Sequence, residues 1–354
     1  MLKGYRVGKT LCPLFGLALL TACGERDPLV RAYVQTMDTS ISIEAPRNAK
    51  DKTFTAAHII EDYAQRIWPQ IDIYNPQSQI ARANAIGGQH RFPISPDVYR
   101  ILDYAMRLSD MTQGAYDLTD APLRVLWRQH WSSNENTLLP EQLVHAMLPH
   151  TGFTFVDLEP QSLSFRVPDA QINVNDLARA YVLDITLVQM RRQGANSLRL
   201  SSDLATRVLG EQSERQPWSI PIYHPREPDT IMAHIHLPDS HAWAVCDAGP
   251  IIETETGRYN RIINPKTGMP AQGVLATGVL APVAMESVAL SRALAALSPE
   301  DGVALLSDLP RHHALIIPDK DPIEMRISPG LKPFFKVEPA YEAYVHDLPT
   351  SAHP

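Results

Sequence analysis

The sequence predicts a mixed α+β globular domain behind a short N-terminal targeting segment. Apolar residues make up 44% of the 354 residues and charged residues 20%, which is typical of a folded chain and excludes global disorder. Stretches with apolar residues at helical spacing are interspersed with stretches that alternate between apolar and polar residues. The 30 prolines predict short helices and many turns, and the net charge of −7 argues against a nucleic-acid-binding protein.

The first 20 residues have the pattern of a secretory signal peptide. Lys3, Arg6 and Lys9 precede an apolar run from Leu11 to Leu20. A run of ten residues is too short to cross a bilayer, which takes about 20 helical residues. A basic segment followed by a short apolar segment is instead typical of a signal that directs export.

The residues after this run resemble the lipobox of bacterial lipoproteins. Ala22 stands directly before Cys23, and Gly24 follows it. The resemblance implies that residues 1–22 are removed, that Cys23 is acylated, and that residues 23–31 tether a periplasmic body to the lipid bilayer. Gly24 favours the outer membrane. The alternative is a free thiol in an ordinary signal peptide.

The N-terminal half of the body predicts one hairpin and two helices. Alternation from Tyr33 to Ile43 indicates a hairpin. Apolar residues at helical spacing predict a helix from Phe54 to Ile71. A second helix is expected to begin at Pro96, because Ser95 can cap it and proline suits the first helical position.

The C-terminal half predicts more strands. A hairpin is expected from Phe153 to Val167, a helix from Asp176 to Gln193 that ends at Gly194, and another helix after Ser298. From Glu338 the sequence is polar with no period, so residues 337–354 are expected to form a loose tail. Further strands are expected at 197–200, 218–223, 231–237 and 242–246.

Most standard catalytic patterns are absent from the sequence. It contains no glycine-rich phosphate loop, no zinc-ligand spacing and no Gly-x-Ser-x-Gly elbow. The neighbours His312 and His313 are expected to be a solvated loop pair.

Two short segments are candidates for a binding site. Gly114 to Thr119 places an aromatic ring, a carboxylate and a hydroxyl in one turn, which could stack and hydrogen-bond a planar ligand. The alternative is a purely structural role for this segment. Gly114 would then end one helix, Tyr116 would pack in the core, and Asp117 would cap the next helix. Arg261 to Gly268 predicts a strand that enters a Pro/Thr/Gly turn, where the amides could receive an anion, although ordinary turn formation explains it equally well.

The order of these motifs resembles the ApbE-like FAD:protein FMN transferases from about Ala32 to Phe335. Met37-Asp38-Thr39 is similar to the first family motif, and Gly257-Arg258-Tyr259 with Pro265-x-Thr267-Gly268 to the last. The other matching residues are Tyr74, Ser78, Ile80 and Asn84, then Gly114, Tyr116, Asp117, Thr119, Pro122, Leu123 and Trp127, then Tyr181 and Asp184.

The resemblance implies an α+β flavin transferase fold over residues 32–336, with two closely packed subdomains and the flavin site between them. It implies a Mg²⁺-assisted enzyme that moves FMN from FAD to a Thr or Ser of a periplasm-facing redox-complex subunit. It also implies the site residues. These are Arg261 and Asn264 as catalytic residues; Met37, Tyr74, Ala115, Tyr116, Asp117, Asn173, Arg179 and Ile263 as cofactor-binding residues; and Asp176, Ser287 and Ser291 as metal ligands.

The sequence departs from the family pattern at residues that are expected to bind the metal ion and the phosphate groups. Ser287 stands where the family has an aspartate, so a weak or lost Mg²⁺ site is expected. Glu286 is adjacent, but one helical step turns a side chain by about 100°. Two readings therefore stay open beside the transferase: a non-catalytic flavin-binding or accessory lipoprotein for assembly of a membrane redox complex, and a solute-binding lipoprotein, which needs only the lipobox.

Overall fold

The computed structural model describes residues 29–88, 90–133 and 137–349. The expected signal peptide, the acylated Cys23 and most of the tether lie outside the described residues. Within the described part of the chain, no helix is both long enough and apolar enough to span a membrane.

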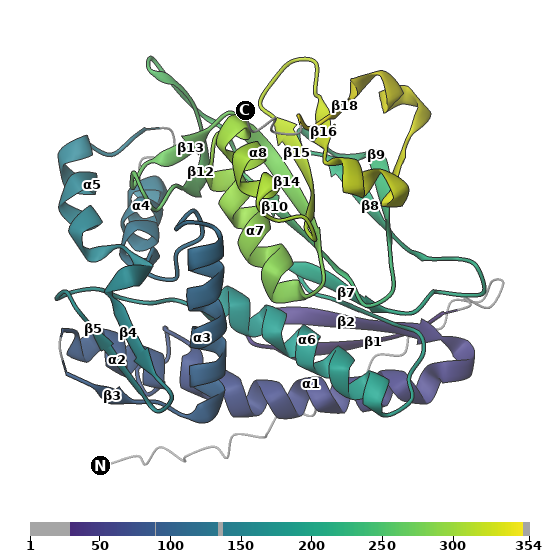
Figure 1. Ribbon diagram of the computed structural model, residues 1–354, viewed down its shortest axis with the longest axis horizontal. Helices are drawn as coiled ribbons and strands as arrows, with labels where there is room; N and C mark the ends of the chain where they lie inside the picture. Colours follow the sequence, from purple (N-terminus) through teal and green to yellow (C-terminus); the bar gives the residue numbers. More distant parts are fainter. Residues whose placement is uncertain (1–28, 89, 134–136, 350–354) are drawn as a thin grey trace, which may run out of the picture.

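A nine-stranded sheet forms the centre of the molecule (Figure 1). Residues 33–43 form a hairpin as predicted, in which β1 pairs antiparallel with β2. The remaining neighbours are antiparallel as well, except for the parallel pair β16 and β18. The strand order is β1 (Leu29–Thr36), β2 (Thr39–Pro46), β6 (Leu198–Ser201), β7 (Ala205–Leu209), β10 (Ala242–Asp247), β14 (Val274–Ala281), β15 (His313–Pro318), β16 (Met325–Ile327) and β18 (Val345–Asp347).

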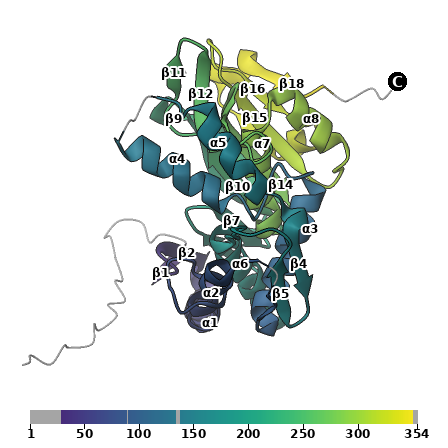
Figure 2. The same cartoon turned by 90° about the vertical axis from the view of Figure 1, so that its left-hand side faces the viewer.

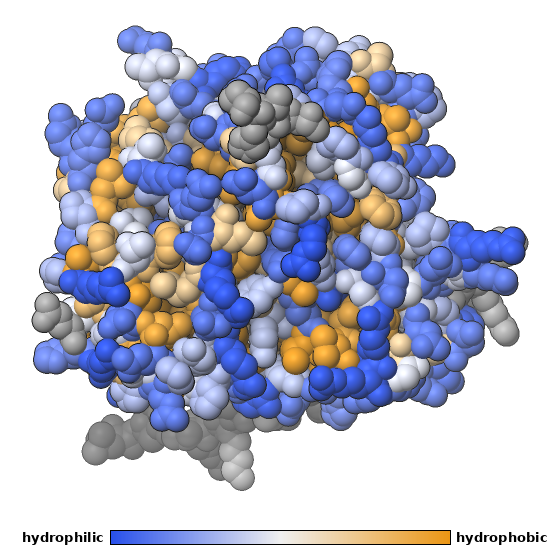
Figure 3. Space-filling view, in the orientation of Figure 1, coloured by the Kyte–Doolittle hydropathy of each residue, from blue (hydrophilic) through white to orange (hydrophobic). Residues whose placement is uncertain are grey.

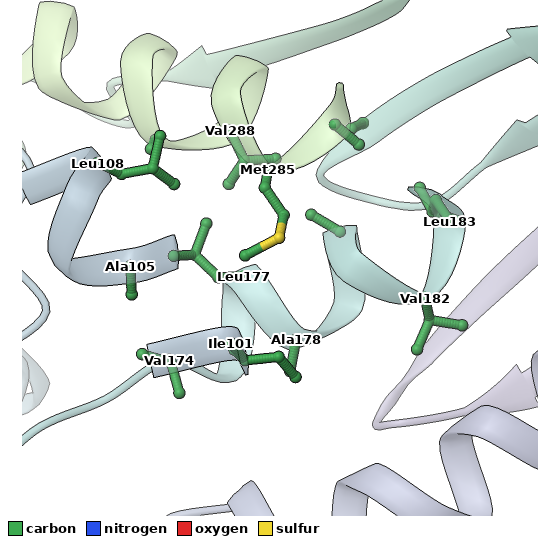
Figure 4. Close-up of a cluster of buried hydrophobic side chains, with 14 of the residues drawn as sticks. Ile101, Ala105, Leu108, Val174, Leu177, Ala178, Val182, Leu183, Met285 and Val288 are labelled. Atoms are coloured by element: carbon green, nitrogen blue, oxygen red, sulfur yellow. The ribbon is translucent and has the colours of Figure 1, made fainter. Parts of the chain in front are cut away.

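Four helices share a core on one face of this sheet. They are α1 (Lys50–Ile71), α3 (Pro96–Met111), α6 (Asn175–Arg192) and α7 (Ala284–Ala296). Met285 and Val288 extend from α7 toward Leu177 of α6 and Leu108 of α3 (Figure 4). All four side chains are buried. This packing places α3, α6 and α7 at fixed positions around the candidate site.

The opposite face of the sheet carries a second core. The strands β8 (Trp218–His224), β9 (Glu227–Leu237) and β17 (Phe335–Val337) form a small sheet that covers it. Side chains alternate between the two cores along a strand, as the pleat requires. Trp243 packs in the second core, whereas its neighbour Ala244 packs in the first.

A third cluster of buried side chains joins α4 (Ala121–Ser133) and α5 (Glu141–Met147) to the strands β11 (Ile252–Thr254) and β12 (Gly257–Ile263). The strand β13 (Pro270–Gln272) pairs with β12. In Figure 2 the elements α4, α5, β11 and β12 lie in the upper part of the molecule, and α1, α2 (Gln79–Ile86) and α6 lie in the lower part. The strands β3 (Phe92–Pro93), β4 (Val156–Glu159) and β5 (Ser162–Phe165) complete the lower part, and β4 with β5 is the predicted hairpin. The mixed α+β class is confirmed.

Two helix starts follow the capping chemistry of the sequence. The hydroxyl of Ser95 accepts a hydrogen bond from the amide of Val98 at the start of α3. Ser298 likewise accepts from the amide of Asp301 at the start of α8 (Pro299–Ser307). Both helices were predicted from these residues.

The segment after Glu338 differs from the predicted loose tail. Residues 339–344 form a 3₁₀ turn, and β18 pairs with β16 at the edge of the large sheet. Leu348 is buried and packs with Val274 and Ile316. Short polar stretches have no period to detect, so this order comes from tertiary pairing rather than from a local pattern.

The molecular surface shown in Figure 3 carries small apolar clusters separated by polar side chains. Among the described residues, the exposed large apolar side chains include Tyr33, Phe54, Tyr74 and Leu143, which lie on separate elements. Isolated exposed apolar residues are normal on a folded protein. Tyr74 is 61% exposed and is the one that bears on the candidate site.

Candidate functional site

The turn between α3 and α4 is closed by hydrogen bonds within itself and to residues 152 and 153. Gly114 has a φ of +79°, a conformation that favours glycine. The carboxylate of Asp117 accepts hydrogen bonds from the Thr119 amide at 2.8 Å, the Thr119 hydroxyl at 2.6 Å and the Phe153 amide at 2.9 Å. Burial raises the pKa of Asp117, while its hydrogen bonds with Thr119 and Phe153 act to lower it.

The side chains of this turn are engaged by the protein itself. Asp117 was expected to bond a ligand edge, and Tyr116 to stack on a ring. Asp117 accepts the three hydrogen bonds named above, and Tyr116 is only 6% exposed, with burial raising the pKa of its phenol. Ala115 is buried as well. The local alternative of a capped turn with a core aromatic residue describes these contacts, and the roles of the three residues toward a flavin stay predictions.

Trp127, which follows the first candidate segment in α4, contacts the second segment. Its indole Nε1 donates a hydrogen bond of 2.7 Å to the carbonyl of Gly268, which is 141 residues away in the sequence. Asn264 shapes the receiving turn, since its side-chain oxygen accepts from the Lys266 amide and its carbonyl accepts from Gly268. Ile263 is buried under this contact. The turn fixes α4 against the end of β12.

A cluster of ion pairs joins α4, α6 and α7. Arg292 of α7 lies 3.0 Å from Asp120 and 3.6 Å from Asp176. Arg124 of α4 lies 3.8 Å from Asp120 and 3.6 Å from Asp176. Burial acts to lower the pKa of Arg292, but the two carboxylates raise it, and the net shift is upward. Arg292 therefore stays charged in a largely enclosed position.

These arginines line an open pocket of about 420 Å³ between α4, β12 and α7. Arg261 stacks its guanidinium over Trp131, 5.3 Å from the ring centroid. We call this the arginine–tryptophan pocket, defined by Arg124, Arg128, Arg261, Arg292, Trp127 and Trp131.

Tyr74 lies at the rim of this pocket. Arg128 donates a hydrogen bond of 2.8 Å to its hydroxyl. The loop that carries Tyr74 is held on α6, because Asn175 donates to Asp72 and accepts from the Ile73 amide. Tyr74 thus links the loop after α1 to the side of the pocket formed by α4.

The pocket brings some predicted residues together and adds others. Arg261 and Ile263 line it, and Asp176 pairs with two of its arginines. The site predicted from the sequence did not include Arg124, Arg128, Trp131 and Arg292, which also line the pocket. A signal for the first three was present, because Arg124/Arg128 and Trp127/Trp131 are spaced four residues apart and therefore follow one another along a helix face.

Three other predicted residues have structural contacts away from the pocket lining. Arg179 donates to the backbone carbonyl of Met37 at 2.8 Å and stacks over Trp68. Met37 is 3% exposed and has a φ of +53°. Asn173 accepts a hydrogen bond from the Asn175 amide at the start of α6. These contacts fix the β1–β2 turn and α6 relative to each other.

The profile of the ApbE family matches residues 37–317. The chain belongs to this family. It is 25% identical over 329 residues to an FAD:protein FMN transferase of Vibrio cholerae, covering 92% of this chain and 98% of that protein. It is 26% identical over 293 residues to an FAD:protein FMN transferase of Haemophilus influenzae, covering 78% of this chain and 83% of the relative.

Solved structures show the same fold. The flavin transferase ApbE from Vibrio cholerae superposes with a TM-score of 0.75 at 23% identity, covering 86% of this chain and 99% of that one. The apo flavinyl transferase ApbE of Pseudomonas stutzeri also gives a TM-score of 0.75, at 21% identity, covering 86% of this chain and 96% of the other. The chain is thus a divergent ApbE protein with the full family fold.

The side chains predicted as metal ligands do not fit Mg²⁺. The Ser287 hydroxyl donates to the carbonyls of Ala242 and Val283, both at 3.2 Å, and the Ser291 hydroxyl donates to Val288 at 3.1 Å. Asp176 is paired with arginines. Mg²⁺ needs several oxygen ligands, usually with carboxylates among them. Within residues 29–88, 90–133 and 137–349, no three His, Cys, Asp or Glu side chains are grouped to hold a metal.

Glu286, the neighbour of Ser287, is engaged by other side chains. It accepts hydrogen bonds from the Tyr104 hydroxyl at 2.7 Å and pairs with Nε2 of His312 at 2.9 Å. His312 is 7% exposed, and His313 begins β15, which corrects the expectation of a solvated loop pair. In this ApbE protein Glu286 therefore ties α3 and α7 to the segment before β15.

Proposed function

We propose that this protein binds FAD and transfers its FMN half to a hydroxyl group of an acceptor protein. Family membership supports the proposal, since its relatives carry the name FAD:protein FMN transferase. The observation that carries it is the arginine–tryptophan pocket with Tyr74 at its rim. Guanidinium groups match phosphate oxygens, and aromatic rings offer stacking faces for a flavin or an adenine.

The transfer needs no redox partner. The oxygen of an acceptor Thr or Ser attacks the phosphorus of the FMN half, and the bond from that phosphorus to the bridging oxygen breaks. AMP leaves with the electron pair, and the hydroxyl proton passes to solvent. Negative charge grows on the phosphate oxygens as the bond breaks, so fixed cations beside them lower the barrier. We assign this role to Arg261 and Arg292, because both line the arginine–tryptophan pocket.

We further propose a periplasmic location with Cys23 as a lipid anchor, and a membrane redox complex as the source of the acceptor subunit. The N-terminal sequence supports this location. Replacing Cys23→Ser should release the protein into the soluble periplasmic fraction and abolish lipid labelling. Retention in the membrane fraction without a lipid label would contradict the anchor.

One observation favours a second candidate, a flavin-binding accessory protein without catalysis. The side chains at Ser287 and Ser291 do not fit Mg²⁺, and Asp120 and Asp176 already pair with Arg292. Such a protein would hold a flavin near a redox complex without splitting it.

Incubation with FAD and a candidate acceptor subunit separates the two. A transferase produces an acceptor that fluoresces as a flavin in a denaturing gel and gains the mass of an FMN group. A matched acceptor with its Thr or Ser changed to Ala should gain nothing. FAD binding with no covalent product for any acceptor would favour the accessory role.

A further inference from the structure

The start of β1 marks the part of the molecule that a lipid on Cys23 would hold near the bilayer. Six residue steps separate Cys23 from Leu29 in the sequence, and an extended chain spans at most about 22 Å over six residues. Leu29 pairs with Pro46 at the open end of the first hairpin, and α1 begins shortly after it at Lys50. A lipid on Cys23 would therefore keep the surface around Leu29 and Pro46 within reach of the headgroups.

Two antiparallel helices connect this part of the molecule to the candidate site. Nζ of Lys52 donates a hydrogen bond of 2.8 Å to the carbonyl of Gln193, directly after α6. At the other end of the pair, Asn175 of α6 donates a hydrogen bond of 3.1 Å to Asp72, directly after α1. Figure 1 shows α1 along the lower edge of the molecule and α4 and α5 at its left.

The arginine–tryptophan pocket lies at the far end of these helices. The 22 residues of α1 span about 33 Å at 1.5 Å per residue. Tyr74 follows the end of α1 and lies at the rim of the pocket through its contact with Arg128. The rim of the pocket is thus about 33 Å from the residues that a lipid on Cys23 would hold near the bilayer.

Charge also differs along this axis. We call the end near Leu29 the anchor end, defined by residues 47–52, 191–192, 211–215 and 239. Within these ranges stand six basic and four acidic residues, whereas the middle of α1 carries the neighbouring acids Glu61 and Asp62. A basic residue near an anionic membrane surface contributes about 1 kcal/mol of attraction. Anionic headgroups therefore attract the anchor end and repel the middle of α1.

We propose that the anchor end rests on anionic lipid headgroups and that the arginine–tryptophan pocket lies at the end of the molecule away from the bilayer. The inference rests on the proposed acylation of Cys23 and is independent of FMN transfer. In this orientation an acceptor hydroxyl meets the pocket about 33 Å or more from the bilayer. The acceptor residue then belongs to an extramembrane part of its protein.

Fluorescence energy transfer to dyes on lipid headgroups tests this orientation. The acylated protein is reconstituted in vesicles that contain phosphatidylglycerol, and Cys246→Ser leaves one engineered cysteine to label. Asn48→Cys probes the anchor end and Gln129→Cys probes α4, since both side chains are exposed. We expect strong energy transfer from position 48 and weak transfer from position 129. Equal transfer from the two positions, or stronger transfer from position 129, overturns the proposal.

Charge reversal tests the contact with headgroups. Lys50→Glu combined with Arg192→Glu should reduce the difference between the two labels, because the anchor end loses its attraction. The control Arg107→Glu changes an exposed arginine on α3 that pairs with Asp103, and it should leave the difference unchanged. High salt should act like the double change without altering the protein. A difference that survives both high salt and charge reversal, or an equal loss in the control, overturns the headgroup contact.

The outcomes also separate this inference from the proposed function. Mass spectrometry of the purified protein shows whether Cys23 carries acyl groups, and a chain without them refutes the lipid anchor and this orientation together. A protein that is oriented as expected but never transfers FMN refutes the proposed function and leaves the orientation standing. FMN transfer by a protein with equal energy transfer from both labels refutes the orientation alone.

Discussion

The guanidinium of Arg292 lies 3.0 Å from the carboxylate of Asp120, although 172 residues separate them in the sequence. Asp120 precedes α4 and is 3% exposed, while the side chain of Arg292 is 18% exposed. The contact therefore joins the C-terminal half of α7 to the start of α4 inside the protein. It also holds Arg292 in the arginine–tryptophan pocket.

Removing the charge of Asp120 should destabilise the fold. Asp120→Asn leaves Arg292 without its nearest carboxylate, and we expect the free energy of unfolding to fall by about 1–3 kcal/mol. Urea denaturation measures it. The matched change Asp103→Asn breaks the exposed pair with Arg107 and should stay within about 0.5 kcal/mol. If Asp120→Asn lowers the free energy of unfolding no more than Asp103→Asn does, the buried ion pair does not stabilise the fold.

Gly268 should tolerate no side chain. Its φ is +70°, and an added Cβ would lie 2.5 Å from Cγ1 of Val144. Gly194 has a similar φ of +75° with nothing within 4 Å, so it reports the backbone cost alone. We expect Gly194→Ala to lower the free energy of unfolding by about 1 kcal/mol, and Gly268→Ala by clearly more. Similar values from thermal or urea unfolding would contradict the close packing at Gly268.

Asp184 should make stability depend on pH. Its carboxylate accepts from the amides of Ala284 and Met285 and lies 2.9 Å from Arg207. Burial raises its pKa from 3.8 to about 6, although Arg207 and the two amides act to lower it. Between about pH 4 and 6, the carboxyl group of Asp184 is therefore mostly protonated in the folded protein and mostly ionised in the unfolded chain. The contribution of Asp184 to stability therefore falls as pH rises through this window.

Comparison with Asp184→Asn isolates this effect. The wild-type free energy of unfolding should decrease relative to the variant by up to about 1.4 kcal/mol per pH unit between pH 4 and 6. Above that range the difference should level off. Parallel curves for the two proteins would show that Asp184 titrates alike in the folded and unfolded states.

Local signals predicted much of the fold. Ser95 and Ser298 marked helix starts because a cap acts within three residues, and the hairpin over 33–43 followed from simple alternation. The segment after Glu338 was mispredicted because its order depends on pairing with β16, which its own composition does not encode.

The site was harder to predict because it is assembled from distant segments. Tyr116 and Asp117 were predicted to bind a ligand from a compact local motif, and the structure adds that both lie in a buried, hydrogen-bonded turn. Arg292 could not be predicted from its neighbours in the sequence, because arginines are common in helices. Its role becomes visible only in the fold, where it contacts Asp120. Ion pairs across 172 residues are a property of the tertiary structure.

Titration of FAD into the purified protein in EDTA tests the central claim most directly, with flavin fluorescence or heat as the signal. We predict saturable binding that Arg261→Gln and Tyr74→Ala both weaken by at least several-fold, because the first loses a cation for the phosphates and the second a stacking ring. Failure of the wild-type protein to bind FAD at high concentration, or equal binding by all three proteins, would contradict a flavin site at this pocket.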